Sequence, residues 1–322
     1  MKHAPVNSSL VAAALLISCA NALAQAYPIK PVRMVVPFPP GGGVDVTARA
    51  FSQKYSDAWG QPVVIENRPG AGGNIGADAV AKSAPDGYSL LVTTTGHAIA
   101  ASLYKKLPFD PIKDFAPASQ LVSTYLVLAA NPGMPATLKE LVTLAKAQPG
   151  KLNYAHTGLG VAPHLVGEML KSIAGIEFLM VPYKGDAQTI PAMMSNEAQF
   201  GFSPPNSAVQ LVKAGKLRAI VVSGARRAAI YPDTPTIAEA GFPAVTYNGW
   251  VGLFAAGGTP RDVLNRVAAE TTRALKTQEI IATLPNLGEA AGGTPEEFAK
   301  IYRDDIALYA KIIKQANIPL VD

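Results

Sequence analysis

Cysteine is nearly absent from this chain, because Cys19 is the only one in 322 residues. A chain with a single cysteine forms no internal disulfide, and beyond residue 26 it has neither a thiol nucleophile nor a thiolate metal ligand. The fold must therefore be held together by its apolar core. With 49% hydrophobic residues, the chain is long enough for one large domain or two ordinary ones.

The sequence also lacks a pronounced excess of either charge. The formal net charge is +5, and the longest basic clusters are the pairs Lys105-Lys106 and Arg226-Arg227. A nucleic-acid-binding surface needs a stripe of basic residues interleaved with aromatic ones, so we expect no nucleic-acid partner. A mildly cationic pocket for an anionic solute fits this charge balance.

Catalytic motifs are missing as well. The chain has no G-x-S-x-G elbow, no H-E-x-x-H pair and no Walker lysine motif. Beyond residue 26 the histidines are His97, His156 and His164, and their spacing fits no metal site. We interpret each as a hydrogen-bonded structural or pocket histidine. The sequence therefore predicts a protein that is not an enzyme and that has no metal and no cofactor.

One glycine-rich segment favours a different class of protein. Gly70–Gly76 follows an expected strand, opens an expected helix and reads G-x-G-x-x-x-G, a variant of the dinucleotide-binding pattern. A dehydrogenase would place an acidic residue, or an arginine, at the end of the next strand. That strand ends in Thr93-Thr94-Thr95-Gly96-His97, which supplies neither. A nucleotide-dependent α/β enzyme therefore stays only as an alternative.

The first 26 residues have the pattern of a cleavable signal peptide. A charged start at Met1–His3 leads into an apolar run, Leu10–Ala20, and small residues follow at Ala22–Ala24. The run is shorter than the roughly 20 apolar residues that span a bilayer. We predict export to the periplasm with a mature chain that begins near Tyr27. A lipid tether at Cys19, within a lipobox-like Leu-Ile-Ser-Cys, is the alternative.

Strand-like and helix-like segments alternate along the rest of the chain, which predicts an α/β fold with mixed, mostly parallel sheets flanked by helices. Capping boxes at Thr137–Glu140 and Thr294–Glu297 mark two helix starts, and the second opens a long amphipathic helix. The expected strands are 33–37, 63–66, 89–94, 126–130, 153–155, 178–181, 200–202 and 218–223.

Two lobes with a cleft between them fit this alternation. The proline-rich stretches 108–117 and 231–243 are candidate crossing points between the lobes. We predict a first lobe built from residues 27–125 and 249–322, which includes the C-terminal helix, and a second lobe built from residues 126–248. Small-molecule sites are common in such interdomain clefts.

Two further glycine-rich loops, 37–43 and 157–164, each join a strand to a helix. Glycines allow the backbone to turn tightly and expose N–H groups at a helix N-terminus, where the helix dipole favours an anion. Two such loops from facing lobes would hold one carboxylate between them without an arginine. Asp45, just inside the first helix, either caps it or orients a bound water.

Six motifs spread over most of the chain resemble those of the Bug-type (TctC-like) solute receptors, the substrate-binding components of tripartite tricarboxylate transporters. They are PFPPGGGVD (37–45), ENRPGAGGNIG (66–76), APDGY (84–88), HLVGE (164–168), VPYKG (181–185) and AGKLR (214–218).

This resemblance implies a two-lobed periplasmic binding protein of the Venus-flytrap type. It is expected to be monomeric, to bind a small carboxylate and to deliver it to the membrane components of a transporter. A receptor that presents its ligand state to a sensor protein is the alternative. The resemblance implies that one ligand carboxylate is held by Phe38, Pro40, Gly41, Gly42 and Asp45 on one lobe, by Gly158, Gly160, Val161, Ala162 and His164 on the other, and that its far end is bound by Thr94, His97, Tyr183, Lys184 and Asn206.

Three departures from the family pattern bear on the ligand. Asp186 stands where small apolar residues are usual, the loop 202–206 lacks a common aspartate, and Gly158 and Gly160 bracket Leu159 where polar residues are frequent. An acidic side chain at the distal end would favour an amine or disfavour a second carboxylate. We favour the simpler interpretation, that Asp186 caps its helix.

Overall fold

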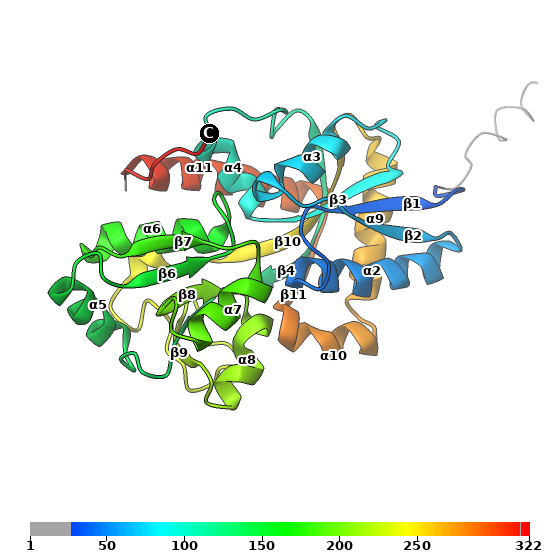
Figure 1. Ribbon diagram of the computed structural model, residues 1–322. Coiled ribbons are helices and arrows are strands. Elements are labelled where there is room, and N and C mark those ends of the chain that lie inside the picture. The colour runs from blue at the N-terminus through cyan, green and yellow to red at the C-terminus, as the bar shows by residue number, and fades with distance from the viewer. Residues whose placement is uncertain (1–26, 316) are drawn as a thin grey trace, which may run out of the picture.

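Two β-sheets organise the chain (Figure 1). The computed structural model describes residues 27–315 and 317–322, so the predicted signal peptide and Cys19 lie outside the described residues. Within these ranges no helix has both the length and the apolarity that crossing a membrane requires. In Figure 1, β1–β3 and α2 of the first lobe lie on the right, and α4 and α11 of the same lobe lie at the upper left. The second lobe, with β6–β9 and α5–α8, lies below α4 and α11.

The first sheet has the strand order β11-β4-β10-β3-β1-β2. β1 pairs in parallel with β2 and β3, whereas β10 pairs antiparallel with both β3 and β4. The strands are β1 (Val32–Val36), β2 (Val63–Asn67), β3 (Ser89–Thr94), β4 (Phe115–Thr124), β10 (Gly249–Ala256) and β11 (Glu289–Gly292).

Helices cover both faces of this sheet. Alternate strand residues face opposite sides, as the period of a strand requires. On β1, Met34 packs against α2, α9 and α10, whereas Val35 packs against α3, α4 and α11. These elements are α2 (Gly43–Trp59), the short η1 (Ala71–Gly73), α3 (Asn74–Ala81), α4 (Gly96–Leu103), α9 (Arg261–Ala274), α10 (Gln278–Leu287) and α11 (Pro295–Gln315).

The second sheet has the order β7-β6-β8-β5-β9, with β6 parallel to β7 and β8, and β5 antiparallel to β8 and β9. Its strands are β5 (Val127–Ala130), β6 (Asn153–His156), β7 (Leu179–Pro182), β8 (Phe200–Ser203) and β9 (Arg218–Val222). Its helices are α5 (Leu138–Ala147), α6 (Ala162–Ala174), α7 (Asp186–Met194), α8 (Pro205–Lys213) and the short η2 (Pro243–Val245).

The sheets are mixed, as predicted, but parallel pairing does not dominate. Of the nine strand pairings in the described ranges, five are antiparallel. The reason is that β4, β10 and β5 carry the chain between the lobes. They are not part of the βαβ units around β1 and β6, so nothing constrains them to run parallel to their neighbours.

The chain passes between the sheets at two places. It leaves the first sheet after Thr124, enters the second at Val127 and returns before Gly249. The two proline-rich stretches are not the crossings: residues 115–117 begin β4 in the first sheet, and Thr236 forms a bridge to Val222 of the second. The lobe boundaries 125/126 and 248/249 remain our proposal, which these two connections support.

The predicted helix starts are confirmed at both capping boxes. Glu140 N–H donates to Thr137 Oγ1 and Glu297 N–H donates to Thr294 Oγ1, each at 3.2 Å. The helix that Thr294 opens, α11, is fastened to β10 by a hydrogen bond of 2.6 Å from Trp250 Nε1 to Asp305 Oδ2. Burial raises the pKa of Asp305 to about 6, with Asp304 adding to the shift and the Trp250 bond opposing it.

This raised pKa predicts a pH dependence of stability. Between about pH 4 and 6 the unfolded chain loses the Asp305 proton before the folded protein does, so stability falls as the pH rises through this window. Asp305→Asn removes the titration and keeps an oxygen for Trp250. We expect the free energy of unfolding of wild type relative to D305N to fall by about 1–3 kcal/mol between pH 4 and pH 7, measured by urea denaturation. The exposed Asp233→Asn, at a residue that does not contribute to the Asp305 shift, is the control. An equal pH dependence in wild type and D305N would contradict the assignment.

Candidate functional site

Five helices begin where the two sheets face each other. α2 and α4 follow the carboxyl ends of the parallel strands β1 and β3, and α6, α7 and α8 follow those of β6, β7 and β8. The carboxyl ends of parallel strands meet at one edge of a sheet, which is the usual position of a ligand crevice in an α/β protein. Each lobe therefore presents a set of helix N-termini at one edge.

The two edges lie against each other. A methyl group at Gly43, in the first turn of α2, would lie 3.3 Å from Oδ1 of Asn206 in α8. At the start of α4, a methyl group at Gly96 would lie 4.0 Å from Cα of Val161. The starts of α2 and α8, and those of α4 and α6, are thus neighbours from opposite lobes.

A second contact closes the cleft beside these helix starts. The Tyr104 hydroxyl donates to the Leu159 carbonyl at 3.3 Å, and Gly160 packs so tightly that a methyl group there would lie 2.5 Å from the Tyr104 ring. Gly72, in the segment that resembles a dinucleotide loop, packs against the same Tyr104 and Leu159. That segment therefore forms part of the contact between the lobes.

None of the five helices has a side-chain cap. The N-cap residues are Gly42, Thr95, Val161, Gly185 and Pro204, and none of their own side chains accepts a hydrogen bond from the helix that follows. At the start of α4, the neighbouring Thr94 Oγ1 accepts from Gly96 N–H. Free backbone N–H groups at a helix start, together with the helix dipole, attract an anion. Without capping side chains, these N–H groups are available to a ligand or to water.

Asp45 organises the first loop and is not itself free to bind. Its Oδ2 accepts from Gly41 N–H at 2.9 Å and from Arg49 Nε at 2.8 Å, and its Oδ1 accepts from Asn67 Nδ2 at 2.9 Å. Burial raises the pKa of Asp45, but the bonds from Arg49, Gly41 and Asn67 together outweigh it and hold the pKa below its usual range. The sequence suggested that Asp45 either caps its helix or orients a bound water. Its two oxygens already accept three hydrogen bonds from the protein, so neither role is needed to explain the residue.

Several buried polar atoms of the second lobe have no hydrogen-bond partner among the described residues. Four of them lie at the edge that faces the first lobe: His156 Nε2, His164 Nδ1, Ser203 Oγ and Asp186 Oδ1. His156 and Ser203 end β6 and β8, and Asp186 and His164 lie in the first turns of α7 and α6. Buried polar atoms are almost always hydrogen-bonded, so these four indicate a place for water or for a polar ligand group.

The two histidines here are neutral at pH 7. Their rings lie 5.1 Å apart, and His156 Nδ1 is 2.8 Å from the Gly158 carbonyl. Burial, together with nearby His156 and Lys171, lowers the pKa of His164 to about 4. Burial also lowers the pKa of His156, and the bond to Gly158 opposes the shift. Neutral imidazoles can donate or accept a hydrogen bond, but they bring no positive charge to the cleft.

Most residues predicted for the carboxylate subsite lie in the two loops at this edge, and Thr94 and Asn206, predicted for the far end of the ligand, lie at the same edge. Phe38 is half-buried against Gly73, and Pro40 and Gly41 are exposed at the tip of the first loop. Thr94 is half-buried and accepts from Gly96 N–H at 3.2 Å. The others are Gly42 in the first loop, Gly158, Gly160, Val161, Ala162 and His164 at the start of α6, and Asn206 in α8.

His97 is not a residue of the cleft, and its prediction as a ligand-binding residue is wrong. Its ring packs in the core of the first lobe, 4.5 Å from the ring of Phe115 and 5.6 Å from that of Tyr302, measured between centroids. Burial lowers its pKa to about 3. In the sequence, His97 directly follows a strand end near the expected site. The sequence did not show that its side chain turns into the core of the first lobe.

Tyr183 is corrected as well, whereas the ligand role of Lys184 stays a prediction. The Tyr183 hydroxyl donates to Glu197 at 3.0 Å, and Glu197 lies near the amino end of β8, away from the first lobe. Lys184 is exposed. Only the Tyr183 carbonyl comes near the site, 4.0 Å from where a methyl group at Gly158 would lie.

The cap proposed for Asp186 is also wrong. Gly185 is the N-cap residue of α7, and the Asp186 carboxylate accepts instead from Ser207 Oγ of α8 at 2.8 Å. Sequence reasoning gave no ligand role to His156 or Ser203. Their position as the last residues of adjacent strands was the signal that could have found them.

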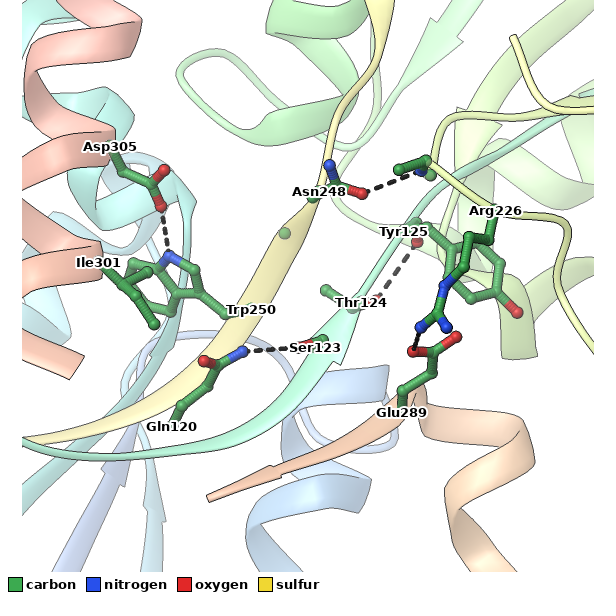
Figure 2. A pocket seen from close by; sticks show the side chains of 13 residues that line it. Gln120, Ser123, Thr124, Tyr125, Arg226, Asn248, Trp250, Glu289, Ile301 and Asp305 are labelled. Atoms are coloured by element: carbon green, nitrogen blue, oxygen red, sulfur yellow. Dashed lines mark hydrogen bonds and ion pairs between the residues drawn. The ribbon is translucent and has the colours of Figure 1, made fainter. Parts of the chain in front are cut away.

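A second pocket, of about 420 Å³, lies at the connections between the lobes (Figure 2). It is lined from β4, β11 and α11, on the flank of β10 opposite to β3 and β1. An ion pair of 2.7 Å between Arg226 and Glu289 joins the lobes across it. None of the residues predicted for the ligand lines this pocket.

The contact at Gly160 gives a test of closure. Gly160→Ala must displace the Tyr104 ring and with it the bond to Leu159, so we expect a more open protein with a larger radius of gyration in small-angle X-ray scattering. Gly160 also has a φ of +79°, and Gly150, with a φ of +69° and open space around it, is the matched control. Both variants should lose about 1 kcal/mol of stability to backbone strain, and only G160A should open. Equal scattering from G160A and G150A would show that this contact does not hold the lobes together.

Comparisons with known proteins agree with this architecture. The model of the tripartite tricarboxylate transporter family receptor, TctC, matches residues 47–318. Protein BugT of Bordetella pertussis is 32% identical, over 92% of this chain and 92% of its own length. The structure of R. palustris Rpa4515 with adipate is 31% identical with a TM-score of 0.86, and it covers 92% of this chain and 100% of that one.

MatC from Rhodopseudomonas palustris with bound malate is likewise 31% identical with a TM-score of 0.83, over 89% of this chain and 100% of that one. The Bug-type resemblance and the two-lobed fold of a periplasmic binding protein are thereby confirmed. The chain belongs to the TctC family of tripartite tricarboxylate transporter receptors.

Proposed function

We propose that this protein is an exported receptor that binds a small carboxylate between its lobes and delivers it to the membrane components of a tripartite tricarboxylate transporter. The observation that carries the proposal is the meeting of five uncapped helix starts from two lobes. Relatives with the same fold hold dicarboxylates, adipate in one and malate in another.

The carboxylate is bound by backbone N–H groups at the starts of α2 and α6. Among the residues placed at these starts no lysine or arginine faces the cleft, and Arg49 is engaged by Asp45. Each helix start contributes about 0.3–1 kcal/mol to binding an anion, and more where water is excluded. Several such starts, acting in a closed cleft, give binding without a cationic side chain.

Closure completes the site. An open cleft admits the solute, the N–H groups of both lobes then engage its carboxylate, and a hinge movement at the two connections between the sheets brings the lobes together. The closed form is the one that a membrane partner recognises. Binding by closure needs no nucleophile, metal or cofactor, in keeping with our proposal that the protein is not an enzyme and acts as a monomer.

A thermal-shift screen tests this function. The mature chain, refolded to remove any bound solute, is screened against mono- and dicarboxylates and against their methyl esters as neutral controls. A carboxylate at 100 times its Kd should add about 2.7 kcal/mol to stability, which is a shift of several degrees for a protein of this size. Shifts with carboxylates but not with esters are expected. No shift with any carboxylate would contradict the proposal.

Two substitutions at the N-cap of α6 locate the anion. Val161→Asp and Val161→Asn both supply an oxygen that accepts from the first turn, and both lose the buried valine side chain. The two variants are therefore compared with each other and not with wild type. Only V161D places a negative charge where the carboxylate binds, and it should weaken carboxylate binding at least about tenfold relative to V161N, because like charges repel at close range. Titration calorimetry measures the carboxylate affinities of V161D and V161N. Equal affinities would show that the carboxylate does not bind at the start of α6.

A further inference from the structure

The carboxylate of Asp186 is the one buried acid at the facing edges without a full set of partners. Its Oδ2 accepts from Ser207 Oγ at 2.8 Å. Its Oδ1 is inaccessible to solvent and has no hydrogen-bond partner among the described residues. Asp45, the buried acid of the opposite lobe, differs in that both of its oxygens are bonded. Asp186 Oδ1 is therefore the carboxylate oxygen at these edges that lacks a hydrogen-bond donor among the described residues.

The environment of Asp186 does not supply a cation. Burial raises its pKa, the Ser207 hydroxyl opposes the shift, and no charged side chain contributes. A carboxylate that is buried without a cation or further donors is unfavourable in a folded protein. The group does not cap its helix, because Gly185 occupies the N-cap position. Within the second lobe the Ser207 bond and the positive start of α7 stabilise this acid, but neither gives Oδ1 a hydrogen-bond partner.

Asp186 lies beside the proposed carboxylate subsite. It is the first residue of α7, and its partner Ser207 follows Asn206, whose side chain reaches Gly43 at the start of α2. The loop before α7 approaches the second glycine loop through the Tyr183 carbonyl, near Gly158. Ser203 Oγ, at the end of β8, is a further buried polar atom without a partner at this edge.

We propose that Asp186, with Ser207, forms a subsite for a protonated amine, so that the ligand is an amino-carboxylate and not a dicarboxylate. The proposal rests on the function proposed above, because the helix starts hold the ligand's carboxylate while Asp186 holds its other end. The ammonium group donates to Asp186 Oδ1, its positive charge balances the buried carboxylate, and the Ser207 oxygen can accept from it as well. A second carboxylate placed here would face a like charge.

The test compares ligands that differ only at the distal end. Titration calorimetry is run on the mature protein with 4-aminobutanoate against succinate and with 6-aminohexanoate against adipate. Butanoate and 4-hydroxybutanoate serve as neutral-ended ligands. Because a hydrogen bond between charged groups is stronger than one between neutral groups, we expect the better amino-carboxylate to bind at least about tenfold more tightly than the dicarboxylate of equal length.

Variants assign the preference to Asp186. Asp186→Asn keeps the shape and removes the charge, so the amino-carboxylate should bind at least about tenfold more weakly, while the dicarboxylate binds as before or better. Asp186→Ala must show the same loss. The exposed Asp233→Asn makes the same change of charge elsewhere on the second lobe and should leave both affinities unchanged. Without ligand, D186N should be at least as stable as wild type, because it removes a buried charge.

The outcomes separate this inference from the proposed function. Tighter binding of dicarboxylates by wild type, equal binding of 4-hydroxybutanoate and 4-aminobutanoate, or a preference that D186N leaves intact would overturn the amine subsite and leave the carboxylate receptor standing. A D186N protein that is clearly less stable without ligand would make the acid structural and overturn the subsite too. Failure of every carboxylate, butanoate included, would instead contradict the receptor itself.

Discussion

Unpaired backbone N–H groups at the facing edges of the two lobes are the constraint on which this structure depends. Helix starts expose N–H groups and a positive partial charge, and five of them meet here without side-chain caps. Closing two such edges on each other with nothing between them would bury donors without partners and oppose like partial charges. The closed arrangement therefore requires acceptors between the lobes, and the proposed carboxylate with its waters would supply them.

The rest of the molecule lets the lobes meet at this edge. One apolar cluster includes Leu128 of the second sheet, Phe254 of the first and Tyr309 of α11, so the core is continuous across the connections between the lobes. Glycines at the contacts, such as Gly43 and Gly160, leave no room for a side chain between the edges. The apolar core packs the lobes together at their two connections, and close backbone contacts join them at the helix starts.

Much of the fold could be predicted from the sequence. Alternating strand and helix patterns gave the α/β architecture, and the Thr137 and Thr294 boxes marked helix starts because capping is encoded locally in a few residues. The direction of the crossing strands could not be predicted, because β4 and β10 pair over a long sequence separation. The proline-rich stretches indicated crossings that lie a few residues further along.

The candidate site was predictable where backbone geometry decides it and not where side-chain direction does. The glycine loops marked the starts of α2 and α6. His97 and Tyr183 follow the carboxyl ends of β3 and β7, but one packs into the core and the other extends toward Glu197. The burial of Asp186 against Ser207 depends on how two helices pack, which neither sequence segment contains by itself.

Hydrogen exchange of the backbone amides, measured by mass spectrometry with and without a saturating carboxylate, tests the central claim most directly. The account predicts that the ligand protects the starts of α2 and α6 together, because both lobes donate N–H groups to the same anion. Protection confined to one lobe, or to the pocket at the hinge around Arg226 and Glu289, would contradict it.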